Sequence, residues 1–169
     1  RDRETAETAI RAAMTGHLVL STLHCNDAPS AAPRLLDMGV DPYLLSTSLI
    51  GVVGQRLLRR LCVHCRVETD SAPLEAYTGR FVSSCVFDQG SCAKCEGTGF
   101  KGRTAVHEVL TLASELADAI AAKAPVGTIR RLAAPHGFRP IQADALDRII
   151  AGETSLREAH RHVFFELAA

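Results

Sequence analysis

The sequence predicts an α/β protein that carries a cysteine-rich insertion and a mainly helical C-terminal part. Three observations predict this class: a nearly continuous apolar run at residues 17–24, two Cys-x-x-Cys pairs near the middle of the chain, and several helix-favouring segments after them. The composition, 47% hydrophobic and 22% charged, is that of an ordinary globular protein. We expect three parts along the 169 residues: residues 1–61, 62–103 and 104–169.

The charge balance argues against a protein whose main task is to bind nucleic acid. The chain has 19 Lys and Arg residues and 19 Asp and Glu residues, whereas nucleic-acid binders usually carry a basic excess. No apolar run approaches the roughly 20 residues that cross a bilayer. The first residues, RDRETAETAI, lack an initiator Met and the features of a signal or transit peptide. We therefore expect a cytosolic fragment whose beginning lies upstream of Arg1.

The first expected elements are a helix, a strand and a second helix. Residues 4–15 are rich in helix formers and are followed by Gly16, which ends the helix. The run HLVLSTLH at residues 17–24 has the apolar character of a strand that is buried on both faces of an α/β sheet. An Asn-Asp pair then precedes a helix over about residues 29–38.

A longer helix is expected from Asp41-Pro42 to about Leu61, because a capping Asp followed by Pro starts helices. Apolar residues recur in it at helical spacing: Leu45, Leu49, Val52, Val53 and Leu57.

The part that follows the cysteines is expected to be one strand and a small helical bundle. Residues 104–112 alternate like a strand. Helices are expected over residues 114–124, 128–134 and 142–151. A capping box formed by Ser155 and Glu158 opens the last helix.

The two Cys-x-x-Cys pairs, Cys62/Cys65 and Cys92/Cys95, are the strongest chemical signal in the chain. Each short turn brings two sulfurs to one side, and two pairs supply the four thiolates that structural zinc prefers. Disulfide bonds, a redox pair or unused thiols are the alternatives, but nothing indicates export or a thioredoxin-like context. Four protein ligands leave no position for water, so the zinc would hold the fold without chemistry of its own. Cys85, in the apolar context SSCVF, is expected to be buried, and a spare metal ligand is the alternative.

Two histidines bracket the predicted strand, His17 at its start and His24 at its carboxyl end. In open α/β sheets ligands bind at the carboxyl ends of strands, where a His can donate a hydrogen bond to a phosphate. The alternative to phosphate binding is a histidine whose ring nitrogens form hydrogen bonds with backbone groups. The chain contains no phosphate loop of the pattern G-x-x-x-x-G-K-[ST], so it has nothing to cradle a triphosphate.

Four arginines, Arg56, Arg59, Arg60 and Arg66, lie around the first cysteine pair. We interpret these arginines as the end of a helix that runs into the cysteines. Zn²⁺ with four thiolates carries a net negative charge, which the arginines offset. A patch that binds phosphate or lipid is the alternative.

Several segments occur in an order that is specific to one family. The first are RD followed by ETA within residues 1–6, TGHLVLSTLHCND at residues 15–27 and QRLLRRLC at residues 55–62. The paired cysteines then continue into G-x-x-G-R-T-x-x-x-E, which ends at Glu108, and DALDRIIAGETSLREAHR fills residues 144–161. These segments resemble the secretion-ATPase superfamily, which drives type II protein secretion and type IV pilus assembly, and they cover nearly the whole chain.

The resemblance implies the C-terminal part of a RecA-like P-loop ATPase core with an inserted tetracysteine zinc module and a C-terminal helical subdomain. For the full-length protein it implies ATP and Mg²⁺ as cofactors and a homohexameric ring at the cytoplasmic face of the inner membrane. The implied partners are the inner-membrane platform and its cytoplasmic adaptor proteins. His17 and His24 take the role of the family's histidine box, with His24 near the γ-phosphate. The zinc site is typical of the secretion and pilus-extension branches, and its ligands are Cys62, Cys65, Cys92 and Cys95.

Two departures from the family pattern bear on activity. Cys25 replaces a Thr that is common there, and a thiol is a weaker hydrogen-bond donor than a hydroxyl. The family's Walker A loop, acidic box and Walker B glutamate would all precede Arg1, so this chain alone is expected neither to bind nor to hydrolyse ATP. We expect part of a type II secretion ATPase. A pilus-extension ATPase and a stand-alone zinc-held adaptor without ATPase activity are the alternatives.

Overall fold

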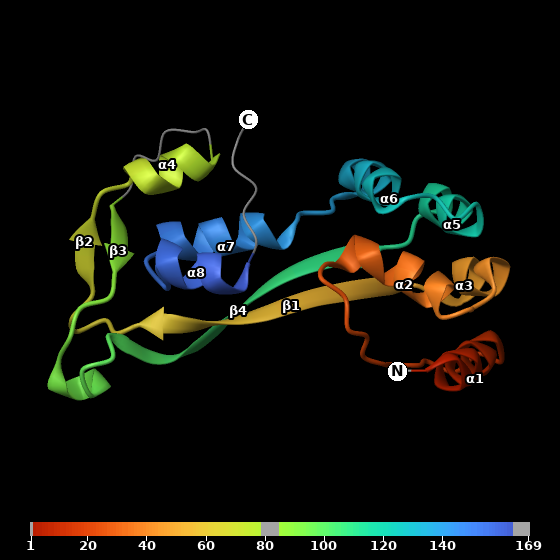
Figure 1. Cartoon of the computed structure of the whole chain (residues 1–169), viewed down its shortest axis with the longest axis horizontal. Coiled ribbons are helices and arrows are strands. Elements are labelled where there is room, and N and C mark those ends of the chain that lie inside the picture. Colours follow the sequence, from red (N-terminus) through yellow and green to blue (C-terminus); the bar gives the residue numbers. More distant parts are fainter. Residues whose placement is uncertain (1, 79–84, 164–169) are drawn as a thin grey trace. The chain divides into compact units, whose positions relative to one another are not determined.

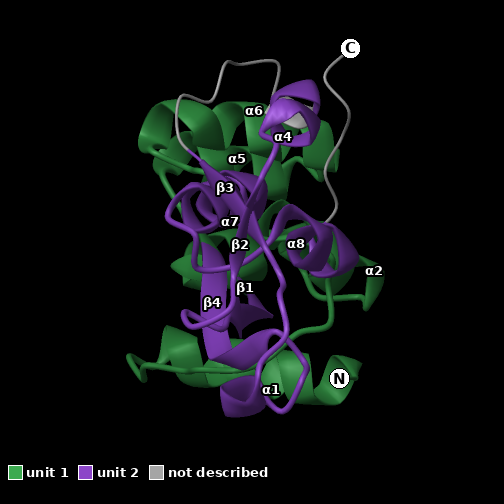
Figure 2. Ribbon diagram, turned by 90° about the vertical axis from the view of Figure 1, so that its left-hand side faces the viewer, with its two compact units in different colours: residues 1–54, 108–139 green, residues 55–107, 140–169 purple. Residues whose placement is uncertain are grey.

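The computed structural model describes residues 2–78 and 85–163. The chain divides into two compact units, the first made of residues 1–54 and 108–139 and the second of residues 55–107 and 140–169 (Figure 2). Each unit is built from two stretches that are distant in sequence, and each has its own hydrophobic core. The division into three consecutive parts stays a prediction.

Two long strands pair with each other: β1 (Gly51–Leu61) and β4 (Phe100–Thr111) form a two-stranded sheet (Figure 1). Side chains along most of both strands alternate between more and less exposed positions, as the two-residue period of a strand requires. A second, smaller sheet lies in the second unit, where β2 (Val67–Thr69) pairs antiparallel with β3 (Val86–Asp88).

The first unit is mostly helical. Its helices are α1 (Arg3–Met14), η1 (Ala28–Ser30), α2 (Ala31–Asp37), α3 (Pro42–Ser48), α5 (Ser114–Ala121), α6 (Val126–Ala133) and η3 (Ala134–His136). Helix α5 contacts both α3 and α6. The core of this unit is formed by Ala28, Ala32, Val40, Leu45, Leu110, Leu116, Ile120, Ile129 and Ala133.

The second unit packs two helices against strand residues. Its helices are α4 (Ala72–Thr78), η2 (Ala93–Cys95), α7 (Ile141–Ile150) and α8 (Leu156–His162). Helix α7 contacts α8 and also β3 (Figure 1). The core of this unit is formed by Leu58, Leu74, Val86, Val106, Ile141, Ala145, Ile149, Ala159 and Val163.

Most predicted helices are confirmed, together with their caps. Asp2 caps α1 by accepting a hydrogen bond from the Thr5 N–H (2.9 Å), and Asp41 caps α3 in the same way. Ser155 caps α8, although the Glu158 carboxylate turns to Arg59 instead of completing the capping box. The strand expected at residues 104–112 is β4, which begins earlier.

The strand predicted at residues 17–24 is not formed. This segment is irregular, and Leu18 and Leu20 are 75% and 87% exposed. A strand buried on both faces needs a neighbour whose backbone groups pair with its own. Among the described residues no strand pairs with this segment, so its apolar side chains remain uncovered.

The long helix predicted from Asp41 to Leu61 is also wrong. Helix α3 ends at Ser48, and the rest of the segment forms β1. A spacing of four residues is compatible with a strand as well as with a helix, because four is a multiple of two. The β-branched residues Val52 and Val53 favour the strand, and Gly51 and Gly54 disfavour a helix.

Three short elements between the cysteine pairs, β2, α4 and β3, were not predicted. The Asp70 carboxylate precedes α4 and accepts a hydrogen bond from the Ala72 N–H (2.9 Å), which is a local sequence signal for the helix start. Cys85, expected to be buried, is exposed, and it lies directly before β3. Within the described ranges, no helix is long and apolar enough to cross a bilayer.

Candidate metal centre

The first cysteine pair follows directly after β1. The backbone N–H of Cys62 donates to the Gly99 carbonyl oxygen (2.9 Å), which ties the end of β1 to the start of β4. The N–H groups of Cys65 (3.1 Å) and Arg66 (2.9 Å) both donate to the Cys62 carbonyl oxygen. This tight turn places the Cys62 and Cys65 side chains on the same side.

The second cysteine pair frames the short helix η2. The N–H groups of Cys95 (3.3 Å) and Gly97 (3.0 Å) donate to the Cys92 carbonyl oxygen, which repeats the turn of the first pair. The Gly99 N–H then points at the Cys95 sulfur (3.2 Å). Such N–H···S bonds stabilise a thiolate and orient it toward a metal.

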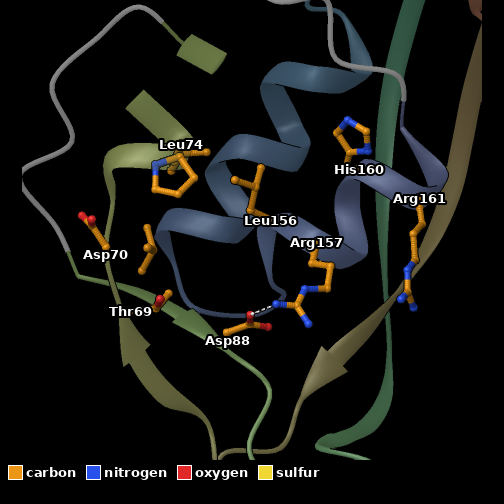
Figure 3. A pocket seen from close by; sticks show the side chains of 10 residues that line it. Thr69, Asp70, Leu74, Asp88, Leu156, Arg157, His160 and Arg161 are labelled. Carbon is orange, nitrogen blue, oxygen red and sulfur yellow. Dashed lines mark ion pairs between the residues drawn. The ribbon is translucent and has the colours of Figure 1, made fainter. Parts of the chain in front are cut away.

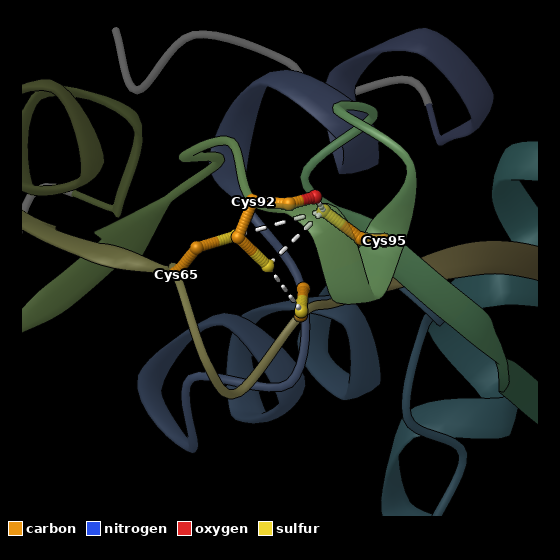
Figure 4. Close-up of side chains that lie close together, drawn as sticks. Cys65, Cys92 and Cys95 are labelled. Carbon is orange, nitrogen blue, oxygen red and sulfur yellow. Dashed lines mark hydrogen bonds between the residues drawn. The ribbon is translucent and has the colours of Figure 1, made fainter.

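The four sulfurs form a compact group, with all four atoms within 4.8 Å of one another. Cys62 Sγ lies 3.9 Å from Cys92 Sγ, and Cys95 Sγ lies 3.7 Å from both Cys65 Sγ and Cys92 Sγ (Figure 4). Four sulfurs at about 2.3 Å from a central zinc would be about 3.8 Å apart in a regular tetrahedron. The spacing fits that arrangement, and it is far longer than the roughly 2 Å of a disulfide bond.

The pKa values of two of these thiols, Cys65 and Cys95, are shifted in opposite directions. Burial and the neighbouring thiols raise the pKa of Cys65 to about 12. Burial also opposes ionisation of Cys95, yet backbone groups of Cys92 and Gly99 and the adjacent thiols lower its pKa to about 6. The Cys95 thiolate therefore forms readily, while the raised pKa of Cys65 opposes its ionisation unless a cation lies between the sulfurs.

Two glycines let the cysteine turns approach each other. A Cβ at Gly90 would lie 1.8 Å from the Cys65 carbonyl oxygen, and a Cβ at Gly99 would lie 2.5 Å from the Gly90 carbonyl oxygen. No side chain fits at such distances, so both positions require glycine.

The turn between α7 and α8 supports the chain on either side of Cys62. The Leu61 N–H donates to the Glu153 carbonyl oxygen (2.8 Å), and the Thr154 hydroxyl donates to the Arg59 carbonyl oxygen (2.9 Å). Beyond the first cysteine, Arg66 Nη1 donates to the Gly152 carbonyl oxygen (2.6 Å). The cysteine cluster thus belongs to the hydrogen-bonded framework of the second unit.

Two of the four arginines near the cysteines lie over aromatic rings. The Arg59 guanidinium lies 4.0 Å from the centre of the Phe100 ring, and that of Arg66 lies 4.3 Å from the centre of the Phe87 ring. Arg59 also forms an ion pair with Glu158 (2.6 Å). These contacts explain both side chains without a bound phosphate or lipid. The sequence could not indicate the Glu158 contact, since 99 residues separate the partners.

The predicted histidine pair lies outside the cysteine cluster. His17 follows α1, with its Nδ1 3.0 Å from Thr15 Oγ1 and 3.3 Å from the Ala12 carbonyl oxygen. His24 is exposed on the irregular segment. In the described part of the chain, the four cysteines are the only group of His, Cys, Asp and Glu side chains close enough to share a metal ion.

A concave site of about 490 Å³ lies elsewhere in the second unit, between α8 and the β2–β3 sheet (Figure 3). Leu74 and Leu156 line its apolar part. Arg157 forms an ion pair with Asp88 across it (3.4 Å). This site was not predicted, because its walls come from segments far apart in the chain.

The chain is an α/β protein whose four clustered cysteines lie, in sequence, between its two long strands. Residues 1–161 match the family model described as type II/IV secretion system protein, and the chain belongs to this family. It is 43% identical over 165 residues to type II secretion system protein E of Dickeya dadantii and 42% identical over 161 residues to the type II secretion system protein HxcR of Pseudomonas aeruginosa. It is also 42% identical over 163 residues to the type IV pilus assembly ATPase PilB of Thermus thermophilus.

The chain spans only part of these relatives. The matches cover 94–95% of this chain but 32% of the Dickeya protein, 31% of the Pseudomonas protein and 18% of the Thermus protein. Among solved structures, the pilus retraction motor PilT with bound ADP is similar, with a TM-score of 0.61 and 23% identity. That similarity covers 95% of this chain and 36% of PilT, and it supports the fold alone.

Proposed function

We propose that this chain is the C-terminal part of a hexameric ATPase that couples ATP hydrolysis to type II protein secretion. The observation that carries the proposal is the family match over residues 1–161 together with the tetracysteine cluster. In this proposal the first residues complete a RecA-like core, and the assembly works at the cytoplasmic face of the inner membrane with the platform and its adaptor proteins.

His17 and His24 form the nucleotide-sensing part of the proposed ATPase. His24 would donate a hydrogen bond to the γ-phosphate of ATP, and Mg²⁺ would accompany the nucleotide. The 169 residues contain no phosphate loop, so the nucleotide would be held by a part of the ATPase outside them. The exposed apolar side chains of Leu18 and Leu20 support this view. If residues 17–24 form a strand beside a neighbouring strand, these side chains would be covered in the completed sheet.

The four cysteines would hold one structural Zn²⁺. Cys62, Cys65, Cys92 and Cys95 supply a complete tetrahedral ligand set with no open position, so the metal fixes the module and takes no part in hydrolysis.

A pilus-extension ATPase is the second candidate, because the identity to the Thermus pilus assembly ATPase (42%) nearly equals that to the Dickeya secretion protein E (43%). A stand-alone zinc-held adaptor is less well supported, because the similarity extends through the histidine segment and not only through the cysteine module.

A chimera tests the proposal directly. Residues 1–161 would replace the matching region of the Dickeya secretion protein E and, separately, of the Thermus pilus assembly ATPase. We expect the Dickeya chimera to hydrolyse ATP and restore secretion, and His24→Ala to lower kcat by roughly 100-fold. ATP hydrolysis by the Thermus chimera but not by the Dickeya chimera would favour the pilus-extension function. Two well-folded chimeras that bind metal but hydrolyse no ATP would overturn the proposal.

A further inference from the structure

A buried carboxylate of the first unit lies beside the segment that carries His24. Glu108 of β4 is 3% exposed, and it accepts a hydrogen bond from the backbone N–H of Ala28, which is fully buried. A carboxylate is costly to bury unless it is hydrogen-bonded. Its hydrogen bond to Ala28, four residues after His24, suggests a task that the proposed function does not yet include.

Gly54 of β1 leaves room for this carboxylate. A Cβ at residue 54 would lie 2.8 Å from Cγ and 2.9 Å from Oε1 of Glu108, closer than packed atoms tolerate. Oε1 is the atom that accepts the Ala28 N–H. Glycine within a strand weakens it and often marks such a close approach.

A second contact fixes the same turn from another element. Asp27 caps η1 by accepting a hydrogen bond from the Ser30 N–H (3.0 Å), and its other carboxylate oxygen accepts one from Arg130 of α6. Residues 27–30 are therefore held from β4 and from α6. His24 precedes Asp27 by three residues, so the fixed turn limits where the exposed imidazole can lie.

From these contacts we infer that Glu108 is a positioning residue for His24, acting through the Ala28 amide, and that Gly54 keeps the space its carboxylate needs. The inference rests on the proposed role of His24 in sensing the γ-phosphate. Glu108 does not touch the nucleotide in this arrangement. It fixes the backbone at Ala28, four residues after His24, so that the His24 imidazole is positioned to contact the phosphate.

Amide hydrogen exchange of the 169-residue chain tests the contact itself. Glu108→Ala removes the acceptor, Gly54→Ala displaces it, and Glu108→Gln keeps an acceptor oxygen. Gly127→Ala is the matched control, because a Cβ there meets nothing within 4 Å. We expect the Ala28 amide to exchange about ten-fold faster or more in the first two variants and near the wild-type rate in the others. Unchanged exchange in both Glu108→Ala and Gly54→Ala would overturn the inference.

Kinetics of the Dickeya chimera test the positioning role. We expect Glu108→Ala and Gly54→Ala to lower kcat about ten-fold with little change in the KM for ATP, and Glu108→Gln to restore most of the loss. The decisive comparison adds Glu108→Ala to His24→Ala. A positioning residue has no further effect once His24 is gone, whereas an equal loss in both backgrounds would show a structural role and overturn the inference.

The two proposals fail in different ways. If neither chimera hydrolyses ATP, the proposed function is wrong, and if His24→Ala leaves hydrolysis unchanged, the proposed role of His24 is wrong. In both cases the positioning role falls as well, even where exchange confirms the Ala28 contact. If His24→Ala abolishes hydrolysis but Glu108→Ala and Gly54→Ala do not change kcat, only the positioning role is wrong.

Discussion

Glu158 of α8 accepts three hydrogen bonds from Arg59 of β1. Its Oε1 accepts from the Arg59 backbone N–H (3.1 Å) and Nε–H (3.0 Å), and its Oε2 accepts from Nη2 (2.6 Å). The Glu158 side chain is 1% exposed and that of Arg59 is 44% exposed. Because Arg59 lies three residues before Cys62, this pair fixes the strand that leads into the first cysteine pair.

Replacing Arg59 by Ala should destabilise the second unit, since it leaves the Glu158 carboxylate buried without its cation. We expect the free energy of unfolding in urea to fall by about 2 kcal/mol. Arg157→Ala is the control, because its ion pair with Asp88 lies at the surface and should contribute less than about 1 kcal/mol. Equal losses in the two variants would contradict a structural role for the Arg59 pair.

The same pair should make stability depend on pH in the acid range. The hydrogen bond from Arg59 lowers the pKa of Glu158, with further help from the Arg59 amide and from His162 at 3.4 Å. The unfolded chain then binds a proton before the folded one does, so the pair's contribution is present above about pH 4.5 and fades as the pH falls below it. We expect Glu158→Gln to flatten the pH dependence of urea unfolding between about pH 5 and 3. An unchanged slope would argue against the lowered pKa.

Gly99 and Gly102 form a matched pair for testing the packing of the cysteine turns. Both have positive φ, +73° and +80°, so Ala strains the backbone at either position. Only Gly99 also lacks room, because a Cβ there would lie 2.5 Å from the Gly90 carbonyl oxygen, whereas a Cβ at Gly102 meets nothing within 4 Å. We expect Gly99→Ala to weaken zinc affinity in chelator competition by about ten-fold more than Gly102→Ala. Similar affinities would show that the close approach is unimportant for the metal.

The 169-residue chain alone should not bind ATP. It contains no phosphate loop to hold a triphosphate, and a histidine at the phosphate cannot replace one. We expect no saturable heat when MgATP is titrated into the chain in a calorimeter, and saturable binding to the Dickeya chimera. Tight binding to the chain alone would mean that these residues form a nucleotide site of another kind.

Local signals predicted much of the secondary structure and the grouping of the four cysteines. Caps at Asp2, Asp41 and Ser155 act over three residues, so the helix starts were visible in the sequence. The cysteine cluster was also predictable, because each pair fixes its own geometry within a short turn.

Features that depend on distant partners were not predictable. The run at residues 17–24 has the composition of a buried strand, but pairing requires a neighbour that the described residues do not provide. The spacing of Leu49, Val53 and Leu57 is compatible with both a helix and a strand, and the pairing of β1 with β4 decides between them. The contacts of Glu108 with Ala28 and of Glu158 with Arg59 join residues 80 and 99 positions apart, which no local pattern encodes.

Native mass spectrometry of the chain, purified under reducing conditions, tests the zinc centre most directly. We expect one Zn²⁺ per chain, and we expect a Cys62→Ser/Cys95→Ser variant to lose it. Cys85→Ser should keep the ion, because Cys85 is exposed and outside the cluster. A folded chain with four reduced cysteines and no metal, or loss of zinc in Cys85→Ser alone, would contradict a zinc site formed by Cys62, Cys65, Cys92 and Cys95.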